Sequence, residues 1–357
     1  MSDYGRELSD KKLKALENKI KREYSKATKE AQKKIIEYLE RFAEDDSVMR
    51  KKLSDGEITK KQYADWRADK LMATNDWQIT ADSLSSTFEK AREVAAEMMA
   101  GHVKDIYALS HNYAEYEIEK DLKASLSFNL YDSDTVERLL VDNPKMLPNP
   151  GKKVEADIKA GKIKRWNKKH IQSSMLQSIL QGESLPMIAK RVSKAVGGME
   201  QYVAIRSART MTTTAESAGR VDRYKAVKEM GIEMQQMWIA TLDLHTRSSH
   251  RHLDGERINV GETFSNGLRY PGDLNGRPEE VYNCRCTIGA VIPGTDLDRL
   301  GIEGVQRNSR LGDMSYEDWK KEREKRGDVP MQDENDKLIL TGRIVKPKTK
   351  RKRKTRK

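Results

Sequence analysis

A long amphipathic stripe near the start of the chain most strongly limits how it can fold. Between residues 11 and 43, apolar or small side chains recur in steps of three or four, which places them on one face of an α-helix. The stripe consists of Leu13, Leu16, Ile20, Tyr24, Ala27, Ala31, Ile35, Tyr38 and Phe42. A helix of this length has to bury its apolar face, so the pattern predicts a core or a helix–helix seam.

The same periodicity predicts further helices. They are expected over residues 57–78, 84–126, 166–181, 185–196, 200–230 and 315–326. Gly197-Gly198 is expected to separate two of them, and Asp134 with Glu137 resembles a capping box that opens a short helix. Residues 142–151 contain three prolines and a glycine, which predicts a loop or a domain border.

Short strand-like runs follow at residues 237–240, 257–260 and 287–292, separated by turn residues. Apolar residues make up 36% of the chain and charged residues 35%, which favours modest cores over one large core. We therefore predict a predominantly α-helical α+β protein with a small, loop-rich β-sheet. The expected division is a helical region at 1–141, a mixed domain at 152–293, a charged segment at 294–345 and a disordered tail at 346–357.

The chain shows no sign of membrane insertion or secretion. No apolar run approaches the roughly 20 residues that a membrane span requires, and the N-terminus lacks the apolar stretch of a secretion signal. The two cysteines stand one residue apart, unlike the disulfide framework of a secreted protein. We expect a soluble chain in a reducing cytoplasm.

The positive charge is concentrated at the C-terminal end. The net charge is +12, but without the nine basic residues of the tail the chain has 59 basic against 56 acidic residues. Those nine residues are Lys346, Lys348, Lys350, Arg351, Lys352, Arg353, Lys354, Arg356 and Lys357. Such a run can neutralise phosphates without reading bases, so it predicts binding to double-stranded DNA without sequence preference. The alternative is a solvated tail that only increases solubility.

Histidine and cysteine are crowded between residues 245 and 286. On an extended backbone, Cys284 and Cys286 would present their sulfurs on one face, which is half of a tetrahedral zinc site. His250, with His245 or His252, could complete a structural zinc site. In the alternative, the cysteines are small buried apolar residues and the histidines bond the backbone. A catalytic metal is a third interpretation.

A hydrolytic site can also be drawn in this segment. His250, His252 and Asp254 have the residue types of a general-base arrangement, although no nucleophile is evident beside them. Asp254-Gly255 is equally a turn signal. Asp243 and Arg247 are expected to form an ion pair that holds the fold.

The order and spacing of these motifs resemble the phage Mu F-like family of minor head (head morphogenesis) proteins. The resemblance covers about residues 160–292. It rests on Arg209, Thr210, Trp238, Asp243, Arg247, Asp254, Gly255, Asn283 and Arg285, together with the histidine and cysteine positions named above. Met211 departs from the family, which usually has Glu there, and some relatives have cysteines where this chain has Arg247 and His250.

The resemblance implies a virion component at the head interior or portal vertex, present in the host cytoplasm during assembly. It implies association with the portal protein, and also with scaffolding or major capsid protein. It further implies binding to DNA and no enzymatic activity in the core domain. The amphipathic N-terminal helices would supply a docking face. The leading alternative is a small metal-dependent nuclease, or another enzyme, delivered with the phage genome, and a third is a host nucleic-acid-binding protein.

Overall fold

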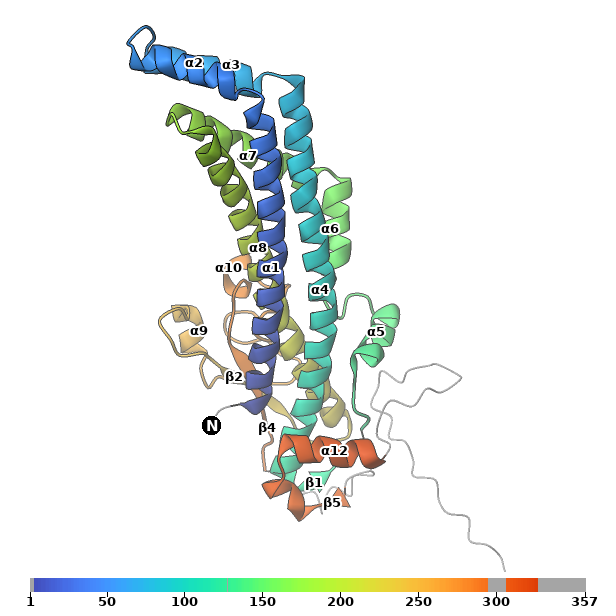
Figure 1. Ribbon diagram of the computed structural model, residues 1–357. Coiled ribbons are helices and arrows are strands. Elements are labelled where there is room, and N and C mark those ends of the chain that lie inside the picture. Colours follow the sequence, from blue (N-terminus) through green and yellow to red (C-terminus); the bar gives the residue numbers. More distant parts are fainter. Residues whose placement is uncertain (1–2, 127, 295–305, 327–357) are drawn as a thin grey trace, which may run out of the picture. The chain divides into compact units, whose positions relative to one another are not determined.

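A computed structural model describes residues 3–126, 128–294 and 306–326 (Figure 1). Most of these residues are helical, and the strands form one three-stranded and one two-stranded sheet, both antiparallel. The predicted fold class is therefore confirmed. None of the helices in these ranges combines the length and apolarity that a membrane span demands.

The helices and strands have the following bounds. The helices are α1 (Tyr4–Glu40), α2 (Ala43–Ser54), α3 (Lys60–Met72), α4 (Asn75–Leu122), α5 (Ser133–Asp142), α6 (Pro150–Lys159), α7 (Lys162–Leu180), α8 (Leu185–Glu229), α9 (Ser248–His252), α10 (Pro278–Val281), the 3-10 helix η1 (Ser309–Asp313) and α12 (Tyr316–Arg326). The strands are β1 (Ala124–Ser125), β2 (Gln235–Ile239), β3 (Arg257–Asn259), β4 (Thr287–Val291) and β5 (Gln306–Arg307).

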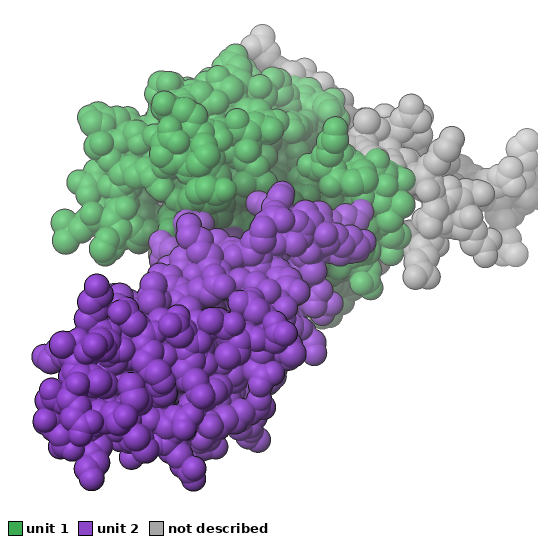
Figure 2. All heavy atoms as spheres, turned by 90° about the horizontal axis from the view of Figure 1, so that it is seen from above, with its two compact units in different colours: residues 1–11, 102–148, 209–357 green, residues 12–101, 149–208 purple. Residues whose placement is uncertain are grey.

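The chain forms two compact units, each made from separate stretches of sequence (Figure 2). The first contains residues 1–11, 102–148 and 209–357, and the second contains residues 12–101 and 149–208. The linear domain boundaries expected from sequence stay predictions.

The second unit is built on the predicted stripe. From Leu16 to Tyr38 the stripe residues are buried, and only Leu13 and Phe42 at its ends are partly exposed. The prediction of a core or helix seam is confirmed. Because this face is covered within the chain, it cannot be the docking surface expected from the sequence.

Gly197-Gly198 does not separate two helices, because α8 runs through both glycines without a break. A Cβ atom at Gly197 would lie 2.1 Å from Thr28 Oγ1 on α1 and 3.3 Å from the ring of Phe88 on α4. A Cβ atom at Gly198 would meet nothing within 4 Å. Gly197 therefore permits close helix packing, whereas the sequence had suggested a helix stop.

Two other boundaries were wrong. The helix expected over 57–78 is divided between α3 and α4, and the Thr74 hydroxyl accepts the backbone N–H of Trp77 at the start of α4. The loop or border expected over 142–151 is present as a non-helical segment at 143–149, but it ends early, because Pro150 begins α6 behind an Asn149 cap, where proline suits the first turn of a helix.

Helix α2 was not predicted because polar contacts, rather than an apolar stripe, hold its buried side. Asp46 on α2 accepts hydrogen bonds from Tyr63 at 2.7 Å and from the fully buried Arg67 at 2.8 Å. Hydrophobic periodicity does not reveal a polar pairing of this kind.

In the first unit, the three-stranded sheet has the order β3-β2-β4, with Trp238 opposite Ile288. All three strands were predicted. The sheet shares one core with the C-terminal part of α8, through residues such as Tyr224 and Val227, and with Ile118 of α4. The short β1–β5 pair was not predicted, since two-residue strands have no detectable period.

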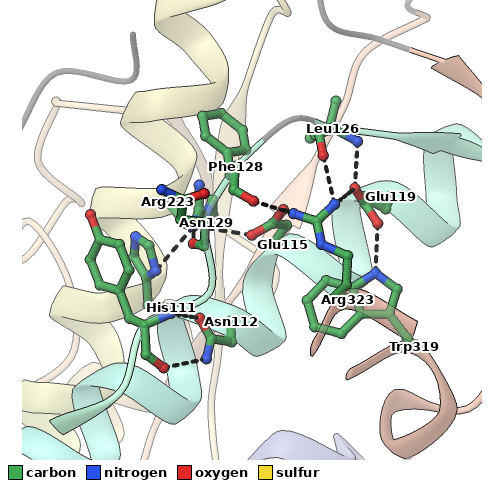
Figure 3. Close-up of polar contacts among 11 residues, drawn as sticks. His111, Asn112, Glu115, Glu119, Leu126, Phe128, Asn129, Arg223, Trp319 and Arg323 are labelled. Atoms are coloured by element: carbon green, nitrogen blue, oxygen red, sulfur yellow. Dashed lines mark hydrogen bonds and ion pairs between the residues drawn. The ribbon is translucent and has the colours of Figure 1, made fainter. Parts of the chain in front are cut away.

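Helix α12 is held to α4 by a buried network of charges (Figure 3). Arg323 pairs with Glu115 at 2.6 Å and with Glu119 at 3.1 Å, and the Trp319 indole donates to Glu119 at 2.6 Å. Arg223 on α8 reaches the second oxygen of Glu115 at 3.0 Å. One cluster thus ties α4, α8 and α12 together.

The two glycines of α8 provide a matched test of the packing. Gly197→Ala should destabilise the protein by about 1–3 kcal/mol, because Thr28 has to move from the new methyl group. Gly198→Ala should leave the stability unchanged or increase it by up to about 1 kcal/mol, because alanine favours the helix. Urea unfolding of both variants measures the difference. Equal effects would contradict close packing at Gly197.

Candidate functional site

The predicted histidine and cysteine residues meet in one buried cluster. Cys284 and Cys286 lie just before β4, and His250 lies on α9. The Nδ1 atom of His250 is 3.5 Å from the sulfur of Cys284 and 3.6 Å from that of Cys286. All three side chains are buried, with 1–2% of each residue exposed, and neither cysteine forms a disulfide.

The other side of the His250 ring faces a carboxylate. Glu280 on α10 lies 2.8 Å from Nε2, and Ser249 donates its hydroxyl to the same carboxylate oxygen at 3.1 Å. Trp238 packs edge-on against the imidazole, with ring centres 5.2 Å apart. Since a carboxylate accepts hydrogen bonds, Nε2 carries a proton, and in the neutral ring the lone pair of Nδ1 points at the sulfurs.

The two thiols affect each other's ionisation. Their mutual hydrogen bond raises the pKa of Cys284, and burial adds to that shift. The same bond lowers the pKa of Cys286, and the hydrogen bond with His250 contributes in the same direction.

Threonines of α8 fix the loop that carries the cysteines. Thr213 donates to the carbonyl of Cys284 at 2.6 Å, and Thr210 accepts the backbone N–H of Asn283 at 3.1 Å. Asn283 has a φ of 55°, in the left-handed region that asparagine tolerates better than most residues. Thr210 and Asn283, both among the residues on which the sequence resemblance rests, thus shape this loop.

The expected ion pair of Asp243 uses a different arginine. Arg285 donates both terminal guanidinium nitrogens to the Asp243 carboxylate, at 2.5 and 2.6 Å. This pairing holds the pKa of Asp243 well below its usual range. Arg247 donates instead to the backbone carbonyl of Tyr282. Both arginines therefore tie the segment around residues 243–247 to the cysteine loop.

Asp254 and Gly255 form the expected turn. Asp254 accepts the backbone N–H of Ala240 at 2.8 Å, just beyond β2. Gly255 has a φ of 81° and donates its N–H to the carbonyl of Trp238 at 2.9 Å. The turn thus closes back on the central strand of the sheet.

The structure does not assemble the hydrolytic site. His252 is exposed and donates through Nδ1 to the carbonyl of Ser248 at 2.7 Å, while His250 is buried against the thiols. Asp254 is engaged in the turn. Each of these three side chains is thus engaged in a separate contact.

Several further predicted residues can be placed. His245 is exposed, and the metal-ligand group formed by His250 and the two cysteines includes neither His245 nor His252. Arg209 lies exposed on α8. Met211 packs, partly buried, against an apolar cluster. The nine basic residues of the tail lie outside the described residues.

Two residues of this cluster were missed, namely Glu280 and Thr213. Glu280 stands four positions before Cys284, but no period or motif marks it as a partner of His250. Thr213 belongs to a run of threonines, Thr212 to Thr214, in a buried helix, where their hydroxyls require acceptors. That run was a usable signal.

Comparison with known proteins confirms the family resemblance. Residues 169–289 match the family described as "Phage Mu protein F like protein". The chain is 28% identical over 261 residues to "Minor head protein GP7" of Bacillus phage SPP1, covering 70% of this chain and 78% of that protein.

A second relative is named as an enzyme. The chain is 27% identical over 206 residues to "NAD(+)--arginine ADP-ribosyltransferase EFV" of Enterococcus faecalis, covering 57% of this chain. The match spans only 40% of that longer protein. No solved structure matches the chain.

Substitution of Asp254 separates a turn role from a catalytic one. Asp254→Ala removes the acceptor for the Ala240 N–H and should cost about 1 kcal/mol of stability. Asp254→Asn keeps an acceptor oxygen and should restore most of that stability. Urea unfolding of the two variants, with His252→Ala as an exposed control, measures the effect. DNA cleavage by the purified chain that both Asp254 variants abolish would contradict the turn role.

Proposed function

Because residues 169–289 belong to the Phage Mu protein F-like family, we propose that this chain is a phage minor head protein that joins the portal to the genome. The observation that carries the proposal is the extent of the match to the SPP1 minor head protein. That match is more than twice as long as the family segment, so it includes helical parts of the chain outside the family segment.

The proposed DNA contact is the basic tail. Nine lysines and arginines between Lys346 and Lys357 are uninterrupted by any acid. Each phosphate that they neutralise releases condensed counterions, which gives affinity without base recognition. The remainder of the chain is nearly neutral, so the tail would dominate electrostatic attraction to DNA.

We propose no catalytic role for this chain. The residues that could have formed a nuclease site are separated between a buried cluster, an exposed helix face and a turn. The ADP-ribosyltransferase activity is named for a relative of which this chain matches 40%. Transfer of label from NAD to arginine by the purified chain would contradict this part of the proposal.

Co-expression with the portal protein of the same phage should give a complex that survives affinity purification. The same chain should be recovered from purified procapsids made in infected cells. Deletion of residues 346–357 should leave both results unchanged, because we propose that the tail contacts DNA and the rest of the chain contacts the portal. Absence from the portal eluate and from heads would refute a minor head role.

The tail deletion should have a separate effect on DNA. The full-length chain should bind unrelated DNA duplexes with equal affinity, and this affinity should fall steeply as the salt concentration increases. The logarithm of the binding constant should change with the logarithm of the salt concentration by about −0.9 per phosphate contact. The deletion variant should lose most of that slope. Filter binding at several salt concentrations measures it, with heat-stability as a folding control. Unchanged affinity after deletion would exclude the tail as the DNA contact.

A further inference from the structure

We propose that His250, Cys284 and Cys286 bind one zinc ion, through Nδ1 and the two sulfurs. This inference goes beyond the proposed head function and does not depend on it. The three ligand atoms all lie within 4.8 Å of one another, in a fully buried group. These are three of the ligands expected from the sequence, and the expected fourth ligand, His245 or His252, does not belong to the group.

The distances suit tetrahedral zinc. Bonds of about 2.3 Å to sulfur and about 2.0–2.1 Å to nitrogen, at a tetrahedral angle, separate the two ligand atoms by about 3.5–3.6 Å. The observed separations from Nδ1 to the sulfurs are 3.5 Å and 3.6 Å. One ion can therefore contact Nδ1 and either sulfur at normal bond lengths, and the two sulfurs lie within 4.8 Å of each other.

Glu280 prepares the histidine for this role. Its carboxylate, 2.8 Å from Nε2, fixes the tautomer whose Nδ1 lone pair faces the cysteines. Histidine ligands of metals usually donate their second ring N–H to a carboxylate, carbonyl or water in this way. Ser249 orients Glu280 in turn. The carboxylate and its serine thus serve as positioning residues for the histidine.

Without a metal, the imidazole can bond only one of the two thiols, and the other is left to the mutual thiol hydrogen bond. One Nδ1 lone pair faces two thiols at nearly equal distances, and it can accept a hydrogen bond from only one of them at full strength. Zinc would use all three atoms at once. Two thiolates would also balance the ion's two positive charges, which matters because an uncompensated charge is costly in a buried site.

The ligand chemistry selects zinc, and the burial of the ligands favours a structural role. Thiolate and imidazole ligands suit zinc, whereas calcium and magnesium prefer oxygen. With three protein ligands in the described group, a water molecule would take the fourth position. Burial of every ligand leaves little path for a substrate. The ion would instead join α9, which has only five residues, to the start of β4.

The experiment is metal analysis of the full-length chain purified without chelators. We expect about one zinc per chain by mass spectrometry. Cobalt added to the metal-stripped chain should give the thiolate charge-transfer band and the intense visible bands of a tetrahedral site. Cys284→Ser and Cys286→Ser should lose these bands. His252→Ala, on the same short helix but exposed, should keep them.

Glu280→Gln provides a milder test that retains the ligands. It should weaken zinc affinity by about 10- to 100-fold, because the carboxylate no longer supports Nε2. Circular dichroism checks that each variant is folded. A folded wild-type chain with no zinc and no cobalt–thiolate band would overturn the proposal. Rapid alkylation of one thiol in that metal-free chain would assign the cluster to a thiolate–imidazolium pair instead.

Discussion

The first unit depends on buried charges along α4. Glu115 and Glu119 are almost completely inaccessible, and isolated carboxylates in such positions would be very costly. Burial, followed by the neighbouring charge of Glu115, raises the pKa of Glu119 to about 7, while Arg323 opposes that shift. Arg223 and Arg323 reach Glu115 from α8 and α12 respectively. Removing either arginine would leave a buried acid with fewer partners, which is why three separate helices have to assemble together.

The difference between apolar and polar packing explains why the sequence predicted some elements and missed others. The stripe that includes Ile20 and Ile35 faces a core, so its period reports directly on packing. Helix α2 is held by Asp46 and Arg67, whose pairing has no period. Gly197 is ambiguous in sequence, because glycine marks both helix ends and close helix contacts, and only the position of the neighbouring helix decides between them.

The candidate site likewise contains some residues that the sequence reveals and others that only the fold reveals. Its histidine and cysteines could be identified from residue type and spacing, and the structure brings His250, Cys284 and Cys286 together. Glu280 could not be identified from residue type and spacing, because its contact with His250 arises from the fold of a loop about 30 residues away. The motif residues Asp254 and Asn283 are engaged with backbone groups of neighbouring segments. The motif therefore encodes the shape of a loop-rich domain more than a reaction.

A domain stabilised in this way can occur in proteins of different function. Its sheet has three short strands, and polar contacts hold the connecting loops to α8, as Thr213 and Thr214 show. Such contacts are internal to the domain, so they do not constrain what is attached outside it. One relative is named as a minor head protein and another, much longer than its matched part, as an enzyme. The function of this chain is accordingly not determined by the shared domain alone, since a shared scaffold does not determine chemistry.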